Sequence, residues 1–347
     1  MKASISSIEY HLPETVLSSA HLAAEFPDWA VDKIESKTGI RERHIARPDE
    51  CASDLGLIAA RKLFESGACT PETIDYVLFC TQTPDYFLPT TACILQDRLG
   101  IPTSAGALDF NLGCSGFVYG LSLAQGLIET GQSKRVLLIT AETYSKFIHP
   151  LDKSVRTIFG DAAAATLIEA VESDGQPDIG PFVFGTDGKG ANNLMVATGG
   201  MRSPRTEQTA IAVEAESGNW RSPDNLFMDG PKIFEFTLRA VPQCVTQLLA
   251  RSGKRVDQID RFIFHQANEF MLDHLRKKLA LPPERFSVAL RDCGNTVSAS
   301  IPIAMKDDRA SGKFRETDLA MLVGFGVGYS WAATLVRWPQ SRGRAPV

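Results

Sequence analysis

Three residues in this 347-residue sequence could together carry out acyl-transfer chemistry: Cys114, His265 and Asn295. Cys114 follows a short apolar run and precedes a longer apolar stretch with helical spacing. A thiol at such a strand-to-helix turn lies at a helix N-terminus, where free N–H groups and the helix dipole favour the thiolate. The neighbouring Gly113 and Gly116 permit a tight turn and the close approach of a substrate. The sequence therefore marks Cys114 as a candidate nucleophile, with a buried structural cysteine as the alternative.

His265 and Asn295 are hydrogen-bonding residues that could assist this thiol. His265 ends a fully apolar run and opens the tetrapeptide His265-Gln266-Ala267-Asn268, while Asn295 lies in Gly294-Asn295-Thr296. Each has a structural alternative, a satisfied histidine at a strand end and a turn or helix-cap asparagine. A neutral imidazole and an amide both suit a developing enolate oxygen, which carbon–carbon bond formation after decarboxylation requires. The three residues together indicate covalent catalysis of carbon–carbon bond formation.

The elements that must position these residues alternate between short apolar runs and longer amphipathic stretches. Strand-like runs fall at 76–79, 107–110 and 136–139, and helix-like stretches fall at 54–66, 91–99, 117–128 and 236–252. This alternation predicts an α/β protein whose strands are buried and largely parallel. A polar, Gly-rich stretch at 172–180 and a loop at 185–216 indicate a boundary followed by a long functional or interface excursion.

The two parts of the chain resemble copies of one unit. Residues 74–80 match 259–265 at an offset of 185, Gly113-Cys114 matches Gly294-Asn295 at 181, and 137–139 match 321–323 at 184. We therefore expect two duplicated halves, residues 1–174 and 175–347. Because sites form at the carboxyl ends of parallel strands, and all three candidate residues follow predicted strands, the halves should share one site.

Composition excludes several classes of protein. With 44% hydrophobic and 22% charged residues the chain is an ordinary globular protein, and its net charge of −5 provides no global basic field for nucleic acid or an anionic membrane. The seven scattered cysteines form no CxxC pair, which argues against a disulfide framework or a zinc site. The N-terminus has no signal-peptide layout and no apolar run approaches 18 residues, so we expect a cytoplasmic protein.

One Gly-rich segment, 324–328, could be mistaken for a phosphate-binding loop. Its glycines alternate and the apolar sequence continues to Trp331, so it matches neither GxGxxG nor a P-loop. We predict one continuous strand in which the glycines let substrate approach the backbone. A basic cluster at Arg276, Lys277 and Lys278 is either a solvated helix face or a contact for an acidic partner.

At these residues the sequence resembles the β-ketoacyl-acyl-carrier-protein synthase III family of the thiolase superfamily. The motifs that carry the resemblance span nearly the whole chain: 37–45, Gly113-Cys114-Ser115-Gly116-Phe117, Phe159-Gly160-Asp161, 265–268, 294–296 and 324–331. The resemblance implies a thiolase-like five-layered αβαβα fold of two duplicated halves, a homodimer, and a catalytic triad of Cys114, His265 and Asn295. It further implies decarboxylative condensation of an acyl-Cys intermediate with malonyl-acyl-carrier protein, as in fatty acid biosynthesis.

The resemblance also assigns substrates and binding residues. The substrates would be thioesters of coenzyme A or phosphopantetheine, with no metal and no redox cofactor, and the partners an acyl-carrier protein and a second copy of the chain. Residues expected to bind substrate are Thr38, Leu88, Gly230, Phe234, Ala267, Asn268 and Phe325. Arg276, Lys277 and Lys278 are expected to dock the carrier protein.

Several positions depart from the family pattern. Lys33 and Lys153 replace a Trp and an Arg that grip the coenzyme A adenine, and two ammonium groups do not reproduce that stacking. Pro231 replaces an Asn, and Phe270 replaces an Arg implicated in docking. Val327 replaces a Gly, and a valine would strain the backbone if φ is positive at this position. Leu88 replaces an aromatic residue that narrows the acyl pocket across the dimer interface. We therefore expect a longer or unusual acyl group, presented by a carrier protein, in a specialised pathway.

Two alternatives remain open from the sequence. One is an acyltransferase of the same fold that moves the acyl group from Cys114 to a hydroxyl or amine. The other is a non-catalytic subunit that binds acyl chains or a carrier protein. Retention of both His265 and Asn295 favours condensation, because simple transfer does not need two donors for an enolate. We expect the other six cysteines to be packing residues, including Cys80, which is equivalent to His265.

Overall fold

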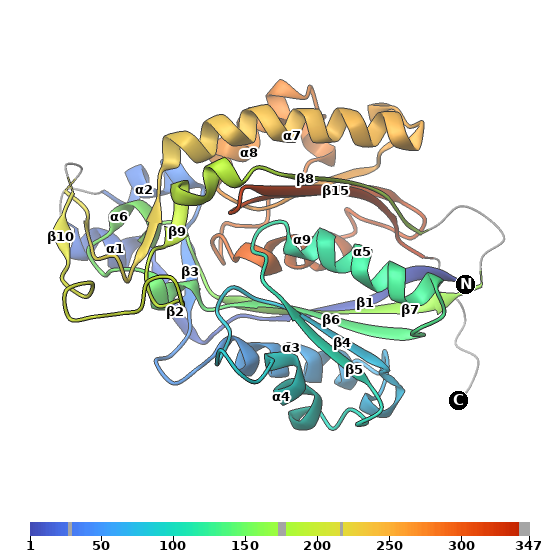
Figure 1. The fold of residues 1–347 in the computed structure, drawn as a ribbon. Helices are drawn as coiled ribbons and strands as arrows, with labels where there is room; N and C mark the ends of the chain where they lie inside the picture. The colour runs from blue at the N-terminus through green and yellow to red at the C-terminus, as the bar shows by residue number, and fades with distance from the viewer. Residues whose placement is uncertain (27–29, 173–177, 216–217, 340–347) are drawn as a thin grey trace.

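Two β-sheets organise the chain (Figure 1). The computed structural model describes residues 1–26, 30–172, 178–215 and 218–339. The first sheet has, in order, the strands β1 (Lys2–His11), β7 (Ala162–Val171), β6 (Arg135–Glu142), β4 (Tyr76–Cys80) and β5 (Gly106–Phe110). The second sheet has, in order, the strands β13 (Arg261–Phe264), β14 (Leu319–Gly326), β15 (Ser330–Arg337) and β8 (Ile179–Thr186).

The strand pairings of the two sheets repeat each other. In the first sheet β4 and β6 are parallel, whereas β6 pairs with β7 and β7 with β1 in antiparallel fashion. In the second sheet β13 and β14 are parallel, whereas β14 pairs with β15 and β15 with β8 in antiparallel fashion. A parallel bridge between Phe262 and Phe286 lies where β5 pairs with β4 in the first sheet. The predicted duplication of an α/β unit is confirmed, while the boundary between residues 174 and 175 lies outside the described residues and stays a prediction.

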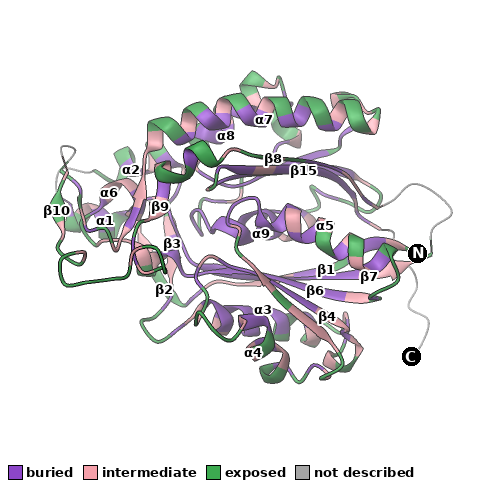
Figure 2. Cartoon of the chain, in the orientation of Figure 1, coloured by how far each residue is buried: buried purple, intermediate pink, exposed green. Residues whose placement is uncertain are grey.

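Helices and sheets alternate in five layers (Figure 1). One outer layer contains α3 (Ala52–Glu65) and α4 (Thr91–Arg98), the middle layer contains α5 (Gly116–Glu129) and α9 (Ser300–Ala310), and the other outer layer contains α7 (Gly230–Ser252) and α8 (Glu269–Lys278). This is the predicted αβαβα arrangement. The middle helices lie between the two sheets, and the outer helices expose one side to solvent (Figure 2).

The middle helix α5 is covered on both sides because its sequence is apolar around much of its circumference. Phe117, Leu121 and Ile128 pack with Leu138 of the first sheet and Leu322 of the second in one hydrophobic cluster. The helix contacts strands of both sheets. Its start at Gly116 therefore fixes the preceding turn, which carries Cys114, between the two halves.

The long outer helix α7 begins six residues before the predicted start at 236. The Asp229 side chain accepts a hydrogen bond from the backbone N–H of Lys232 at 3.0 Å, and Pro231 occupies the first turn. A carboxylate cap and a proline in the first turn are standard helix-start signals, because the first N–H groups have no partner within the helix. This earlier start brings Gly230 and Pro231 to the candidate site.

Smaller elements surround one end of the two sheets (Figure 1). They comprise α1 (Ser19–Glu25), α2 (Val31–Thr38), α6 (Lys153–Arg156), the pair β2 (Thr15–Ser18) and β3 (Glu42–Ile45), the pair β9 (Leu194–Val196) and β12 (Leu226–Met228), and the pair β10 (Val213–Glu214) and β11 (Trp220–Arg221). Short 3₁₀ helices fall at η1 (Pro71–Thr73), η2 (Tyr144–Phe147), η3 (Gly188–Asn193), η4 (Val256–Gln258), η5 (Pro283–Arg285) and η6 (Val297–Ala299). The predicted excursion at 185–216 thus contributes β9 and β10. Among the described helices, none combines the length and apolar character needed to cross a membrane.

Candidate active site

A cavity of about 550 Å³ brings Cys114, His265 and Asn295 together. These residues come from three separate segments of the chain, the turn before α5, the end of β13 and the loop before α9. Five of the other residues expected to bind substrate also line this cavity: Gly230, Phe234, Ala267, Asn268 and Phe325. We refer to this space as the catalytic cavity.

Cys114 lies in a turn that packs directly against the second sheet. A Cβ atom added at Gly326 would fall 2.8 Å from Cys114 Sγ, and one added at Gly324 would fall 2.7 Å from Ser115 Cα. Glycine at these two positions therefore lets the turn that carries Cys114 pack closely against β14. We expected these glycines to let substrate approach the backbone, and that expectation did not include this close packing. The continuous strand predicted up to Trp331 is also wrong, because β14 ends at Gly326 and β15 starts at Ser330.

The Cys114 side chain is held mainly as a thiol. Burial, together with the nearby Glu142 carboxyl, raises its pKa to about 12, although hydrogen bonds from the backbone N–H groups of Cys114 and Val327 act in the opposite direction. The expected stabilisation of a thiolate by the helix N-terminus is therefore outweighed by desolvation. Attack by this sulfur needs a group in the cavity that accepts its proton.

His265 is a neutral imidazole fixed in orientation. Burial lowers the pKa of His265 to about 3, although a hydrogen bond with the backbone of Val297 acts in the opposite direction. Its Nδ1 lies 2.8 Å from Ser300 Oγ at the start of α9, and its backbone N–H donates to Val323 O at 2.8 Å. The ring is thus oriented by both the sheet and the middle helix layer, and it stays uncharged at neutral pH.

Asn295 is oriented by the backbone around it. Its Oδ1 accepts a hydrogen bond from the N–H of Val297 at 2.9 Å, which leaves the Nδ2 amino group as the donor for the cavity. The motif Phe159-Gly160-Asp161 supports this loop, because Gly160 N–H donates to Asn295 O at 3.0 Å and a Cβ at Gly160 would fall 2.3 Å from Cys293 O. Val297 has a φ of 53°, an unusual conformation for a β-branched residue. Asn295 was expected to follow a strand, but the chain before it makes only a single bridge within the described residues.

Glu142 is a buried carboxyl group near the site that the sequence analysis missed. It ends β6 and accepts hydrogen bonds from the backbone N–H of Gln82 at 3.0 Å and from Ser298 Oγ at 2.8 Å. Burial raises the pKa of Glu142 to about 8. The carboxyl links the first half to the loop that carries Asn295. A signal was present, because Glu142 ends an apolar run just as His265 does.

A second, smaller cavity of about 350 Å³ adjoins the nucleophile, and we call it the side cavity. Val327 lines it, as does Leu194, which also lines the catalytic cavity. Further lining residues include the polar Gln82, Asn111 and Tyr144 and the apolar Met195, Val196 and Leu226. The backbone N–H of Val327 also reaches Cys114, so this space lies next to the thiol.

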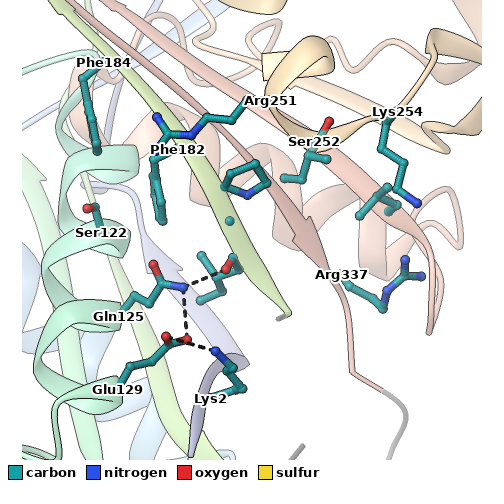
Figure 3. Close-up of a pocket in the computed structure, with 15 residues that line it drawn as sticks. Lys2, Ser122, Gln125, Glu129, Phe182, Phe184, Arg251, Ser252, Lys254 and Arg337 are labelled. Atoms are coloured by element: carbon teal, nitrogen blue, oxygen red, sulfur yellow. Dashed lines mark hydrogen bonds and ion pairs between the residues drawn. The ribbon is translucent and has the colours of Figure 1, made fainter. Parts of the chain in front are cut away.

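A larger cavity, about 770 Å³, lies elsewhere and contains none of the three candidate residues (Figure 3). It runs between α5 and β8 and reaches the C-terminal end of α7. The Gln125 side chain donates to Ile179 O at 2.9 Å, and Lys2 pairs with Glu129 at 3.3 Å. Because chemistry requires convergent reactive groups rather than volume, the smaller catalytic cavity is the candidate active site.

Some of the expected site residues lie outside the catalytic cavity. Thr38 Oγ1 donates to Ile34 O at 2.8 Å at the end of α2. Leu88 is 86% exposed in the loop between β4 and α4. The basic cluster Arg276, Lys277 and Lys278 ends α8, whose first residues follow Asn268 of the cavity. Their roles remain predictions.

The departures from the family pattern alter the cavity mouth. Pro231 and the exposed Phe270 line the cavity, and Phe270 stacks on Phe234 with ring centroids 5.6 Å apart. Lys153 Nζ lies over the Phe26 ring, 5.1 Å from its centroid. Val327 does not have a positive φ, so the strain considered for this position is absent. Among the described residues, no group of three or more His, Cys, Asp or Glu side chains could hold a metal ion.

Comparisons with known proteins agree across the chain. The profile described as 3-oxoacyl-[acyl-carrier-protein (ACP)] synthase III matches residues 108–188, and the profile of its C-terminal region matches residues 249–338. A β-ketoacyl-[acyl-carrier-protein] synthase III from Caldanaerobacter subterraneus subsp. tengcongensis is 36% identical over 328 residues, covering 94% of this chain and 95% of the relative.

Two solved structures are also similar to this chain. A 2.1 Å crystal structure of a 3-oxoacyl-(acyl-carrier-protein) synthase III has a TM-score of 0.96 and 54% identity, covering 97% of this chain and 100% of that one. A 3-oxoacyl-(acyl-carrier protein) synthase from Burkholderia xenovorans LB400 has a TM-score of 0.89 and 40% identity, covering 98% and 95%.

Proposed function

The chain belongs to the β-ketoacyl-acyl-carrier-protein synthase III family of condensing enzymes, and we propose that Cys114, His265 and Asn295 carry out its decarboxylative condensation. The observation that carries this assignment is the convergence of the three side chains on one cavity. That cavity holds a thiol, a neutral imidazole and an amide donor, which are the groups that the reaction requires.

In the first half-reaction, Cys114 Sγ attacks the carbonyl carbon of an acyl thioester. As the sulfur attacks, the thiol proton passes to the departing carrier sulfur, and His265 is the only imidazole among the residues described as lining the cavity that can relay it. The backbone N–H groups of Cys114 and Val327, which already reach the sulfur, hold the oxyanion. The carrier thiol leaves with a proton, and the acyl group remains on Cys114 and extends into the side cavity.

In the second half-reaction, a malonyl thioester loses carbon dioxide to give an enolate. His265 Nε2–H and Asn295 Nδ2 donate hydrogen bonds to the enolate oxygen. The other polar atom of each side chain already has a partner, Ser300 Oγ for His265 Nδ1 and the Val297 N–H for Asn295 Oδ1. The enolate carbon attacks the acyl-Cys carbonyl, a carbon–carbon bond forms and the carbon–sulfur bond breaks. The departing Cys114 thiolate takes up a proton from solvent water and returns to the thiol, and the β-ketoacyl thioester leaves.

The partners follow from this chemistry. We propose that both acyl groups arrive as thioesters of phosphopantetheine or coenzyme A through the mouth next to Asn268 and Phe270. Arg276, Lys277 and Lys278 would contact an acidic carrier protein about 12 Å along the α8 axis from that mouth. Two of them also pair with Asp273, at 2.8 and 2.6 Å.

We also propose a homodimer that works in the cytoplasm. Leu88 and its neighbours Tyr86 and Phe87 form an exposed apolar stretch beyond β4. Contiguous exposed apolar side chains of this kind mark interaction surfaces. Sedimentation of the purified protein tests the dimer, and a monomer at micromolar concentration would contradict a role for Leu88 across the interface.

Intact-mass analysis tests the reaction. The protein is incubated with acyl-coenzyme A and acyl-carrier-protein thioesters, then with malonyl-carrier protein. We expect an acyl adduct on the wild type, absent from Cys114→Ala, and a β-ketoacyl product after the malonyl donor is added. An adduct without that product would instead support acyl transfer to another acceptor.

A further inference from the structure

The side cavity beside the nucleophile has one polar wall that the proposed chemistry does not explain. Three uncharged polar side chains, Gln82, Asn111 and Tyr144, line it opposite the apolar residues of β9 and β12. Gln82 also touches the nucleophile turn, because a Cβ at Gly113 would fall 2.4 Å from Gln82 Oε1. The polar wall therefore lies next to the residue that precedes Cys114.

Hydrogen bonds fix the order of donors and acceptors along this wall. Tyr144 Oη donates to Gln82 Oε1, and Gln82 Nε2 donates to Asn111 Oδ1 at 3.1 Å. The backbone N–H of Gln82 is held by the buried Glu142 carboxyl at 3.0 Å. Within the part of the chain that the structure describes, the Asn111 amide nitrogen donates no hydrogen bond to another residue, and because Asn111 is exposed this nitrogen is open to solvent. The wall thus offers one free donor beside oxygen atoms that can still accept.

An alkyl chain is a poor occupant of such a cavity. It would displace water from the Asn111 amide and from the oxygens of Gln82 and Tyr144 without replacing their hydrogen bonds. A charged acyl group fits no better, because none of the described lining residues carries a charge that could pair with it. A neutral group that both accepts and donates satisfies the wall.

We propose that the primer of this enzyme is a short acyl group bearing an uncharged hydroxyl. The hydroxyl oxygen accepts from Asn111 Nδ2, and its proton is donated to the oxygen of Gln82 or Tyr144. The proposal rests on the proposed function, because it places the acyl chain of the Cys114 thioester in the side cavity. A site built to hydrogen-bond a hydroxyl discriminates strongly against the analogue that lacks it.

The test compares matched thioesters that differ by one group. Rates of Cys114 acylation are measured by intact mass with butyryl, 3-hydroxybutyryl, 4-hydroxybutyryl and succinyl thioesters, each on coenzyme A and on acyl-carrier protein. For the wild type we expect at least one hydroxybutyryl thioester to react about tenfold faster than butyryl, equivalent to about 1.4 kcal/mol, and succinyl to react slowest.

Two variants connect that preference to the wall. Asn111→Leu keeps a similar volume without the donor, and we expect it to lose the hydroxyl preference while it retains acylation by butyryl. Met195→Leu changes the apolar wall and should keep the wild-type ratio. Equal wild-type rates with butyryl and both hydroxybutyryl thioesters, or an unchanged ratio in Asn111→Leu, would overturn the proposal. Failure of every thioester to acylate Cys114 would instead contradict the proposed function.

Discussion

Cys80 and His265 occupy equivalent positions in the two halves, yet only one of them faces the catalytic cavity. Each ends a buried strand that is parallel to a neighbour, β4 in the first half and β13 in the second. The Cys80 thiol donates to Leu112 O at 2.9 Å. It lies so close to the start of α5 that a Cβ atom added at Gly116 would fall 2.3 Å from Cys80 Sγ. His265 lines the cavity instead. The start of α5 thus covers one strand end and leaves the other open to substrate.

The second equivalent pair, Cys114 and Asn295, divides the chemistry in a different way. Both lie in turns that precede the middle helices, Cys114 before α5 and Asn295 before η6 and α9. Both line the cavity. In the proposed mechanism one half supplies the nucleophile and the other supplies both donors, so the reactive groups differ between two halves that share a scaffold.

The largest contrast between the halves should come from their cysteines. We expect Cys114→Ala to abolish the acyl adduct in intact-mass analysis and to lower turnover by more than about 10³-fold, because the covalent intermediate cannot form. Cys80→Ala is the matched control and should still be acylated. An adduct of equal mass on Cys114→Ala would place the nucleophile elsewhere.

Removal of either donor in the second half should separate the two half-reactions. His265→Ala and Asn295→Ala are each expected to slow decarboxylation and condensation by about 10²-fold to 10³-fold, the usual effect of deleting one donor to a developing oxyanion. Acylation by a primer should survive in Asn295→Ala. If Asn295→Ala lost acylation and condensation equally, Asn295 would have a structural role only.

Ser298 and Glu142 connect the halves, and their contact can be weakened selectively. Ser298→Ala removes the 2.8 Å hydrogen bond to Glu142, and we expect condensation to fall about tenfold through displacement of Asn295. Acylation rates should change less, because Asn295 takes no part in the proposed acylation step. Ser298→Thr keeps the hydroxyl and should restore condensation, whereas equal losses in both variants would point to crowding rather than to the hydrogen bond.

A last prediction concerns stability against acid. The pKa of His265 is lowered by burial to about 3, below its ordinary value of 6.5, so between pH 6.5 and 3 the unfolded chain binds a proton that the folded protein does not. Stability should therefore fall with decreasing pH in this window, by at most about 1.4 kcal/mol per pH unit from this group. Urea titrations at several pH values should show a shallower slope for His265→Gln than for wild type, and identical slopes would contradict the buried neutral imidazole.

The sequence predicted those features that depend on local pattern. Buried strands appear as apolar runs, and the repeat of 74–80 at 259–265 predicts that Cys80 is equivalent to His265. The turn between β14 and β15 was missed because its residues are as apolar as the strands on either side. A tight turn that needs no polar residue leaves no compositional signal.

Features that depend on contacts between the halves could not be predicted in this way. The thiol form of Cys114 follows from burial under β14, which lies some 200 residues later in the chain. Glu142 is recognisable as a buried group only when Ser298 and Gln82 are seen to enclose it. Desolvation is a property of the assembled protein, and the helix-dipole argument from sequence had no means of including it.

The position of α5 between the two sheets has a consequence for synthesis of the chain on the ribosome. The first sheet can close once β7 has emerged, but the apolar surface of α5 that contacts β14 and β15 stays uncovered until the last strands are made. For more than a hundred residues of elongation, the nascent chain presents Phe117, Leu121 and their neighbours to water. We expect ribosome-bound intermediates of this protein to be chaperone clients, and truncation shortly before β14 to yield insoluble protein.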